Sequence, residues 1–397
     1  MSQVNINRLW QRLGIAANWP VLAAVAVLSA MGIISIIAAS RADGIKQCVF
    51  LAVALVCMGL FQAVNYQKIG RFAWGFYLFS LLLVAYTVLG KFVQKYGLPL
   101  PGVHTTKGVC CWINFGSISL EPAELMKLSF VLVLARYLRF DKNYRTLPGL
   151  LPPFALALAP LMLILMQPDL GMAMLFIPVL FAMLFVAGAR IKHLLQIVGV
   201  GILLAPVVWF SGSPRMPVLR HLPEIIKPYQ RERMEAFLDQ DNPAERQRKA
   251  YQTYRAMVAF ASGGVAGKGF GVIPVGQSVP EAHNDMIFAL IGEQFGFFGA
   301  AVMLGAYMVL FASGVEIAAG TREPFGRLVA VGIVATLACQ SSINMMVCTG
   351  LMPVTGITLP FVSYGGSSMV ASFMAAGLLL NVGQTRPLVM AREAFDF

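Results

Sequence analysis

The chain has 397 residues, of which 58% are hydrophobic and 12% charged, and its mean hydropathy is +0.73. Soluble domains carry roughly 25% charged residues, and a soluble core of this length needs less apolar surface. The net charge of +12 does not indicate nucleic-acid binding, because the Lys and Arg residues lie in short clusters beside apolar stretches and form no continuous basic face. Composition therefore predicts an all-α, polytopic membrane protein.

The cysteines and glycines exclude several kinds of site. The six cysteines show no CxxC pair and no metal-ligand spacing, and the adjacent Cys110 and Cys111 are poorly placed for a disulfide. Gly267-Lys268 resembles part of a nucleotide-binding loop, but Ser262 and Gly269 stand where such a loop needs Gly and Ser or Thr. We therefore expect no disulfide framework and no zinc, haem or nucleotide.

Ten apolar stretches are long enough to span a bilayer, which takes about 20 helical residues. They cover roughly 18–39, 46–65, 72–90, 122–139, 148–166, 170–188, 193–211, 285–318, 326–348 and 361–382. The first is too long for a signal peptide and lacks a persuasive cleavage site, so it is expected to be a spanning helix. The stretch 285–318 is long enough to tilt or break near Gly296 and Gly299. We expect one membrane domain covering residues 1–397, with both termini on the same side.

The short loops predict which side that is, because Lys and Arg accumulate on the cytoplasmic side. With the N-terminus inside, the cytoplasmic set has 14 members and the outer set five. The cytoplasmic residues are Arg8, Arg12, Lys68, Arg71, Arg136, Arg139, Lys142, Arg145, Arg190, Lys192, Arg322, Arg327, Arg386 and Arg392, and the outer residues are Arg41, Lys46, Lys91, Lys95 and Lys107. Both termini are therefore expected in the cytoplasm.

The segment 212–284 then lies outside, between the seventh and eighth helices, and is too long for a plain connector. Its stretches 223–238 and 244–261 have apolar residues at helical spacing with basic residues between them. Such segments tend to lie flat at the headgroup level. The segment could be a platform for an anionic lipid head, or a folded cap with a solvated basic face.

The polar run Glu281-Ala-His283-Asn284-Asp285 ends where an apolar helix begins at Met286. An ionisable residue at the lip of a membrane helix is expensive unless it has a partner or a task. Asp285 could take a proton from an attacking hydroxyl or hold a divalent cation. Alternatively, Asp285 or Asn284 merely caps the helix.

A second polar group follows Trp112-Ile-Asn-Phe-Gly116. In Glu121-Pro-Ala-Glu124-Leu-Met-Lys127, Pro122 suits a first helical position, and Glu124 and Lys127 share one helix face. The pair could brace the helix bundle internally or take a direct part in chemistry, and the bracing role is the one we favour.

Two further polar stretches interrupt the apolar pattern. In Gln167-Pro-Asp169-Leu-Gly171, Asp169 either caps the next helix or serves the site, and capping is favoured. The run from Gly350 to Ser368 contains two prolines and an SYGGSS sequence. Irregular backbone at membrane depth must be buried in protein or line a cavity. Ser363, Ser367 and the neighbouring backbone N–H groups could hold an anion, or the run could be a close helix-packing face.

Together these stretches resemble the SEDS family (shape, elongation, division and sporulation) of RodA/FtsW-type proteins. The resemblance rests on WINFG…EPAELMK, QPDLG, SGGVAGKGFG…PEAHNDMIFALIGEQFGFFG and GLMPVTGITLPFVSYGGSS…GLLLNV, which follow in this order from about residue 108 to 383.

The resemblance implies a ten-helix membrane glycosyltransferase of the bacterial cell membrane that polymerises lipid II into peptidoglycan strands. It implies that Asp285 is the catalytic aspartate and that Glu124 and Lys127 are a carboxylate–lysine pair. It also implies a divalent cation, Mg²⁺ or Mn²⁺, and a partner that is a class B penicillin-binding protein, a single-span transpeptidase.

The chain departs from the family pattern at four positions. Cys111 stands where Arg is usual, Glu121 where Gln is usual, and Asn284 and Met172 where Thr is usual. These changes remove one cation and add one acid near the proposed site. PEAH resembles division-type members whereas LMPVTGI resembles elongation-type members, so both subtypes stay open.

The expected reaction is an inverting transfer in which the 4-hydroxyl of one sugar attacks the anomeric carbon of a lipid-diphosphate-linked sugar. The diphosphate leaving group needs cations around it, and the candidates are Lys268, Arg255, Arg231 and Arg233. The remaining candidates for binding substrate are Trp112, Glu281 and His283. The alternatives are a flippase for the lipid-linked precursor and a non-catalytic scaffold.

Overall fold

The computed structural model describes residues 18–94, 96–97, 100–103, 110–116, 118–211, 226–239, 251–280 and 282–384. Each predicted apolar stretch contains one long helix, which confirms the all-α membrane architecture. The helices are α2 (Trp19–Ala39), α3 (Arg41–Ala63), α5 (Ala73–Gln94), α6 (Pro122–Phe140), α7 (Leu151–Met166), α8 (Leu170–Ala187), α9 (Ile191–Phe210), α13 (Ile287–Gly320), α14 (Pro324–Cys348) and α15 (Gly366–Gly383).

Nine helical segments in the described part of the chain are long and apolar enough to cross a membrane. Helix α6 is not among them, because its 19 residues carry Glu124, Lys127, Arg136 and Arg139. It nevertheless packs between α5 and α14 as a member of the bundle. The count of ten spans stays a prediction.

Two predicted boundaries are wrong. Helix α15 begins at Gly366, five residues after the predicted start, because Gly365 has a φ of 152° and the residues before it form a turn. Helix α3 begins at Arg41, with Ser40 as its N-cap, so Lys46 lies inside the helix. Only one residue therefore separates α2 from α3.

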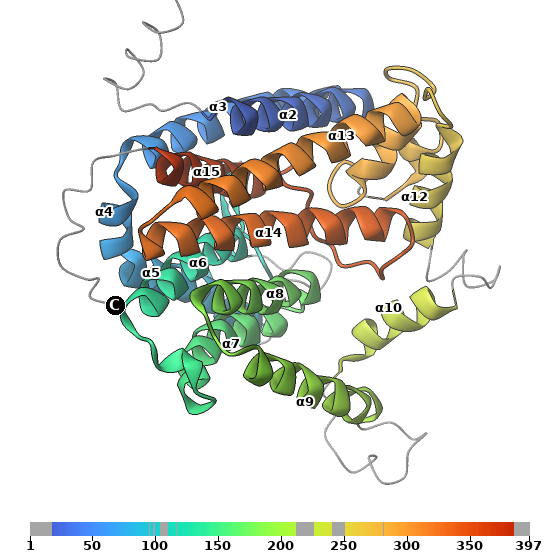
Figure 1. Ribbon diagram of the computed structural model, residues 1–397. Coiled ribbons are helices and arrows are strands. Elements are labelled where there is room, and N and C mark those ends of the chain that lie inside the picture. Colours follow the sequence, from blue (N-terminus) through green and yellow to red (C-terminus); the bar gives the residue numbers. More distant parts are fainter. Residues whose placement is uncertain are drawn as a thin grey trace, which may run out of the picture.

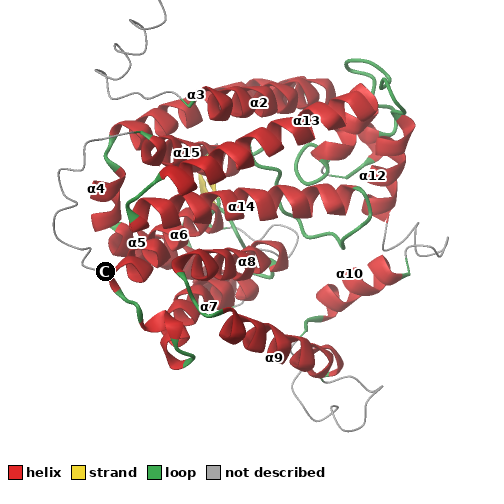
Figure 2. Ribbon diagram, in the orientation of Figure 1, coloured by secondary structure: helices red, strands yellow, loops and turns green. Residues whose placement is uncertain are grey.

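The shorter elements connect and cover the long helices. They are α4 (Tyr66–Arg71), the 3₁₀ turns η1 (Asn143–Arg145), η2 (Pro148–Leu150) and η3 (Gly276–Ser278), the helices α10 (Pro228–Leu238) and α12 (Tyr251–Ser262), and strands β1 (Ile113–Phe115) and β2 (Ile118–Leu120). The two strands pair antiparallel, with Ile113 opposite Leu120, and are the yellow pair among the helices of Figure 2.

The helices form a layered bundle (Figure 1). Helices α2 and α3 pack side by side over α13 and α15, and α14 lies next to α13, α8 and α6. Helix α12 covers one end of α13, and α4 lies at the opposite end of the bundle. Helix α9 runs along the edge of the bundle, and α10 contacts the end of α9 through Arg231.

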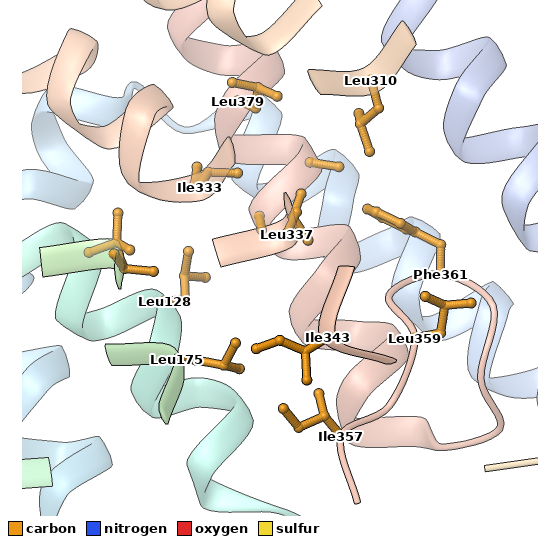
Figure 3. Close-up of a cluster of buried hydrophobic side chains, with 14 of the residues drawn as sticks. Leu128, Leu175, Leu310, Ile333, Leu337, Ile343, Ile357, Leu359, Phe361 and Leu379 are labelled. Carbon is orange, nitrogen blue, oxygen red and sulfur yellow. The ribbon is translucent and has the colours of Figure 1, made fainter. Parts of the chain in front are cut away.

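The buried apolar core gathers around α14. Leu128 of α6 and Leu175 of α8 meet Ile333, Leu337 and Ile343 of α14 on one side (Figure 3). On the other side lie the apolar residues of the loop before α15 and of the upper bundle, which are Ile357, Leu359, Phe361, Leu310 and Leu379. The loop 350–365 is thus packed into the core on its apolar side, which fixes its polar side against α14.

Of the two alternatives left open by the sequence, a tilt or a break near Gly296 and Gly299, helix α13 has a break at Gly296, with φ 61° and ψ −155°. A break inside a membrane helix frees backbone groups that need partners. The glycine-rich loop supplies them: the N–H groups of Lys268 and Gly269 donate to the carbonyls of Glu293 and Gln294 at 2.9 and 3.0 Å. In return, the N–H of Phe297 donates to the carbonyl of Gly264 at 2.9 Å.

This exchange requires glycine at the break. A Cβ on Gly296 would stand 2.4 Å from the backbone nitrogen of Gly267, so any side chain there would separate the two segments. The glycine-rich stretch that resembled a nucleotide loop therefore supplies hydrogen-bond partners to the broken helix.

In the segment 212–284, helices α10 and α12 fall on the two amphipathic stretches. Helix α12 packs on α13, and the rings of Phe260 and Phe288 lie 5.0 Å apart. This contact matches the folded-cap interpretation for α12.

Candidate functional site

Asp285 lies in the turn before α13, one residue ahead of the N-cap Met286. Its backbone carbonyl accepts a hydrogen bond of 2.7 Å from Nδ2 of Asn344. Its carboxylate faces the loop before α15, since a Cβ on Gly356 would stand 3.8 Å from Oδ2 of Asp285. The N-cap position of α13 is occupied by Met286, without a side-chain hydrogen bond. The N-cap residue of α13 is thus Met286 rather than Asp285 or Asn284.

The loop 357–364 is bonded to the polar run before α13. The hydroxyl of Ser363 donates to the carbonyl of Asn284 at 2.6 Å, and the N–H of Tyr364 donates to the carbonyl of His283 at 2.9 Å. The His283 ring packs edge-on against Tyr364 with centroids 5.4 Å apart. Two of the motifs, 79 residues apart at their nearest bonded residues, thus form one surface.

Glu124 and Lys127 form the predicted ion pair, with 2.9 Å between Oε2 and Nζ, and both side chains are buried. Lys127 also donates to Oε1 of Gln340 at 2.6 Å. Among the described residues, the second oxygen of Glu124 has no hydrogen-bond partner. The pair lines a cavity of about 20 Å³ between α6, α14 and α15, which is room for one water molecule.

Several carboxylates gather at this end of the bundle. Glu121, the N-cap residue of α6, lies within electrostatic reach of Glu124, Asp169 and Asp285. Burial and then the Glu124 charge raise the pKa of Glu121 well above its ordinary value, whereas Lys127 opposes the shift. The extra acid that distinguishes this chain from the family pattern therefore lies within this cluster.

Asp169 caps α8, as favoured from the sequence: its Oδ1 accepts from the N–H of Met172 at 3.0 Å. It also belongs to the cluster of acids. Burial raises the pKa of Asp169 to about 6, with Glu124 adding to the shift and the Met172 N–H opposing it. Gly171 lets α8 approach the loop before α15, because a Cβ there would stand 2.4 Å from the carbonyl of Thr355.

Lys268 is paired with Glu293. Its Nζ lies 2.6 Å from Oε1 of the fully buried Glu293, whose Oε2 accepts from the N–H of Gly276 at 2.7 Å. The pair ties the glycine-rich loop to α13 at Glu293, which follows Asp285 in the chain and precedes the break at Gly296. The structure thus gives Lys268 a bracing contact.

The three arginine candidates make contacts of different kinds. Arg255 donates to the hydroxyl of Tyr251 and stacks over its ring within α12. Arg231 of α10 donates to the carbonyls of Trp209 and Ser211 at the end of α9. Arg233 donates to the carbonyl of Val354 at 3.1 Å and lowers the pKa of Asp169. Arg233 thereby contacts the loop that faces Asp285.

The remaining candidates lie around the same end of the bundle or outside the described residues. Ser367 donates to the carbonyl of Ser119 at 2.9 Å and accepts from the N–H of Glu121 at 3.0 Å, so it joins α15 to β2 and α6. Trp112 is half-buried just before β1. Glu281 lies outside the described residues.

Sequence reasoning missed three buried amides that hold the site together. Gln47 of α3 donates to the carbonyl of Ser363 at 2.9 Å and accepts from the N–H of Gly365 at 3.2 Å. Gln340 and Asn344 of α14 contact the Lys127 ammonium and the Asp285 carbonyl, respectively. Polar amides inside otherwise apolar helices were the available signal, since such groups are expensive in a membrane without partners.

Comparison with known proteins gives one consistent relationship. The family described as cell cycle protein, FTSW_RODA_SPOVE, matches residues 10–387. The probable peptidoglycan glycosyltransferase FtsW of Geobacter sulfurreducens is 32% identical over 84% of this chain and 93% of its own length. Stage V sporulation protein E of Bacillus subtilis is 34% identical over 85% of this chain and 86% of its own length.

A solved structure has the same fold. It was determined in work on the structural coordination of polymerization and crosslinking by a peptidoglycan synthase complex. The match has a TM-score of 0.74 and 29% identity, and it covers 93% of this chain and 98% of the other.

Proposed function

The chain belongs to the cell cycle protein family of FtsW, RodA and SpoVE, and from this premise we propose that it polymerises lipid II at the site around Asp285. It is a multi-pass membrane protein and a peptidoglycan glycosyltransferase of that family. The observation that carries the proposal is the convergence of the separated motifs on the Asp285 carboxylate, with Asn344 and the loop before α15 around it.

In the proposed reaction, the 4-hydroxyl oxygen of the acceptor sugar forms a bond to the anomeric carbon of the donor. The bond between that carbon and the lipid diphosphate breaks, and the diphosphate leaves on the opposite face, so the configuration is inverted. Asp285 takes the hydroxyl proton as general base or holds a cation against the diphosphate. Arg233 supports the proposal as a positive charge near the same loop.

A divalent cation fits the site only if Asp285 and the substrate diphosphate bind it together. Among the described residues, no three His, Cys, Asp or Glu side chains are grouped to hold an ion by themselves. Mg²⁺ commonly binds one or two carboxylates together with substrate phosphates. Asp285 would hold the ion with the diphosphate, and a bound ion would neutralise charge on the leaving group.

The test uses the purified full chain and lipid II in detergent, with glycan strands separated on a gel. The Asp285→Ala variant is expected to form no polymer, and the Asp141→Ala variant serves as control because Asp141 lies just beyond the other end of α6. Polymer formation by Asp285→Ala would contradict the assignment. A flippase would form no new glycosidic bond in detergent.

The cation is tested in the same assay. Removing divalent ions with EDTA is expected to stop polymerisation, and adding Mg²⁺ or Mn²⁺ is expected to restore it. Full activity of the EDTA-treated protein would remove the cation from the proposal while leaving Asp285 as general base.

We further propose a class B penicillin-binding protein as partner, and a cytoplasmic location for both termini with the Asp285 site outside. The similarity to a solved synthase complex supports the partner, and the distribution of Lys and Arg supports the orientation. Co-purification with the single-span transpeptidase, and labelling of single cysteines from either side of the membrane, would test these two points.

A further inference from the structure

Helix α14 carries two buried amide side chains on one face. Gln340 and Asn344 are four residues apart, so they lie one above the other on the helix, and both are 1% exposed. Both donate to consecutive residues of the loop before α15, at the carbonyls of Thr358 and Ile357. A rigid helix thus grips an irregular segment at two adjacent points.

Asn344 uses its amide group as a fork. Its Nδ2 donates to the carbonyl of Asp285 and to the carbonyl of Ile357, each at 2.7 Å. A primary amide nitrogen has two protons, so both are occupied by these two carbonyls. The fork holds the backbone of Asp285 directly against the loop that its carboxylate faces.

Gln340 makes the corresponding connection to the ion pair. Its Oε1 accepts from the Lys127 ammonium at 2.6 Å, and its Nε2 donates to the carbonyl of Thr358 at 2.9 Å. Thr358 is further tied to Ser368 at the start of α15, with 2.7 Å between the hydroxyl oxygens. Lys127 therefore reaches the loop through Gln340.

We propose that Gln340 and Asn344 are positioning residues for glycosyl transfer, which hold Ile357–Thr358 between the Glu124–Lys127 pair and Asp285. Through these two residues, the buried ion pair influences the position of the Asp285 carboxylate. The inference deepens the proposed function and rests on it. A displacement of about 1 Å at a reacting group can cost about 100-fold in rate, so a clamp on the Asp285 backbone is expected to affect turnover more than binding.

The first experiment removes the fork. Asn344→Ala deletes the amide, and Asn344→Leu deletes it while keeping a similar volume. Both are expected to lower kcat per folded molecule by about 10- to 100-fold with KM for lipid II nearly unchanged. The matched control is Ser341→Ala, because Ser341 is buried on the same helix and its hydroxyl donates only within it, to the carbonyl of Ala338. Unchanged kcat per folded molecule in both Asn344 variants would overturn the clamp.

A second readout follows the clamp itself. Hydrogen exchange in peptides covering 282–289 and 357–364 is expected to accelerate in the Asn344 variants and to stay unchanged in Ser341→Ala. A uniform acceleration over the whole chain would indicate general destabilisation and contradict a positioning role.

The third experiment asks whether Lys127 acts through Gln340. Lys127→Met and Gln340→Leu are compared singly and together by kcat. If Gln340 transmits the effect, the double variant is expected to lose about as much as the more damaging single variant, which leaves the two losses non-additive by at least about fivefold. Losses that multiply would show that Lys127 acts independently of Gln340. This pair also carries the test if an Asn344 variant yields no folded protein.

The outcomes separate the inference from the proposed function. Polymerisation by Asp285→Ala would reject the proposed function, and the inference with it. An inactive Asp285→Ala together with normal Asn344 and Gln340 variants would leave the proposed function standing and reject only the clamp.

Discussion

Helices α9 and α15 have similar lengths, but α9 is mostly exposed and α15 is mostly buried. The most apolar window of α9 has a mean hydropathy of 2.0 and is 6% buried, whereas that of α15 has a mean hydropathy of 1.4 and is 78% buried. The more hydrophobic helix is therefore the more exposed one. In a bilayer this is expected, since lipid is as apolar as a leucine side chain and helices associate through close packing and polar contacts.

The residues of α15 show what burial requires here. Gly377 allows the backbones of α15 and α3 to touch, since a Cβ there would stand 2.4 Å from the carbonyl oxygen of Met58. Nδ2 of Asn381 shares its two protons among the carbonyls of Phe61, Gln62 and Val64, and Oδ1 accepts from the N–H of Tyr66 at 3.2 Å. One side chain thus satisfies the free carbonyls at the end of α3.

In the described part of the chain, helix α9 makes no contacts of this kind. Within it, Leu194 is the one buried residue, and Leu203 is 76% exposed. A Cβ on Gly199 would meet nothing within 4 Å. The lesson is that contacts, rather than composition, distinguish the two helices: α9 also contains glycines and a glutamine, but its glycines are open, whereas Gly377 and Asn381 of α15 contact the backbone of α3.

The largest effect is expected from replacing a glycine at the contact between α15 and α3. Gly377→Val forces α15 away from α3, because the contact is with rigid backbone, and is expected to cost about 3 kcal/mol or more of unfolding free energy. Gly199→Val in α9 is the matched control and should melt like the wild type. Thermal melting in detergent measures both, and equal melting temperatures for the two variants would refute the comparison.

The next effect concerns the amide of α15. Asn381→Leu keeps the approximate size but leaves the carbonyls at the end of α3 and the N–H of Tyr66 without this partner. Buried groups that lose their partners cost about 1–3 kcal/mol each in general and less where other partners are found, so we expect a loss of about 2–3 kcal/mol. A melting temperature within 1 °C of the wild type, on the order of the measurement error, would contradict this reading.

A smaller effect of opposite sign, a gain in stability, is expected when Asp169 is replaced. The pKa of Asp169 is raised by burial from 3.8 to about 6. The folded protein therefore keeps a proton that the unfolded chain loses between about pH 4 and 6, and stability falls as the pH rises through this range. Asp169→Asn keeps an N-cap side chain and is expected to stabilise the protein by about 2 kcal/mol at pH 7.5.

The pH dependence is the control for that prediction. At about pH 3, which is below the pKa of Asp169 in both the unfolded and the folded state, the carboxyl is largely protonated in both, and the variant and the wild type should melt at nearly the same temperature. A gain that persists at the lower pH would mean that the charge of Asp169 is not its source.

The smallest effect sharpens the other side of the comparison. Leu203→Ala in α9 removes an exposed side chain and is expected to change stability by less than about 0.5 kcal/mol. Leu378→Ala in α15, where Leu378 is fully buried, should cost about 2–5 kcal/mol. Melting of the pair in one detergent measures the difference.

Much of the fold follows from sequence. Long apolar stretches must form helices in a membrane, so the ten stretches were found, and Gly296, where α13 breaks, was one of two glycines near which a tilt or break was expected. The start of α15 was placed too early, because Phe361 and Val362 are apolar and buried but belong to a turn. Apolar character reports burial or lipid contact without reporting backbone conformation.

The candidate site was predicted as residues but not as an arrangement. The spacing of Glu124 and Lys127 sufficed to predict their ion pair, since it lies within one helix. Lys268 was expected near the substrate, yet its partner Glu293 is 25 residues away and was not singled out. Gln340 and Asn344 were overlooked because nothing local links α14 to Asp285.

The sequence by itself determined the class of protein, the helices and the residue types available for chemistry, because hydropathy and helical spacing act over a few turns of chain. Only the tertiary structure decided that the polar segments meet, and which amide holds which carbonyl. Those contacts join residues far apart in the chain, 59 positions in the case of Asn344 and Asp285, and they depend on how the helices pack rather than on any short pattern.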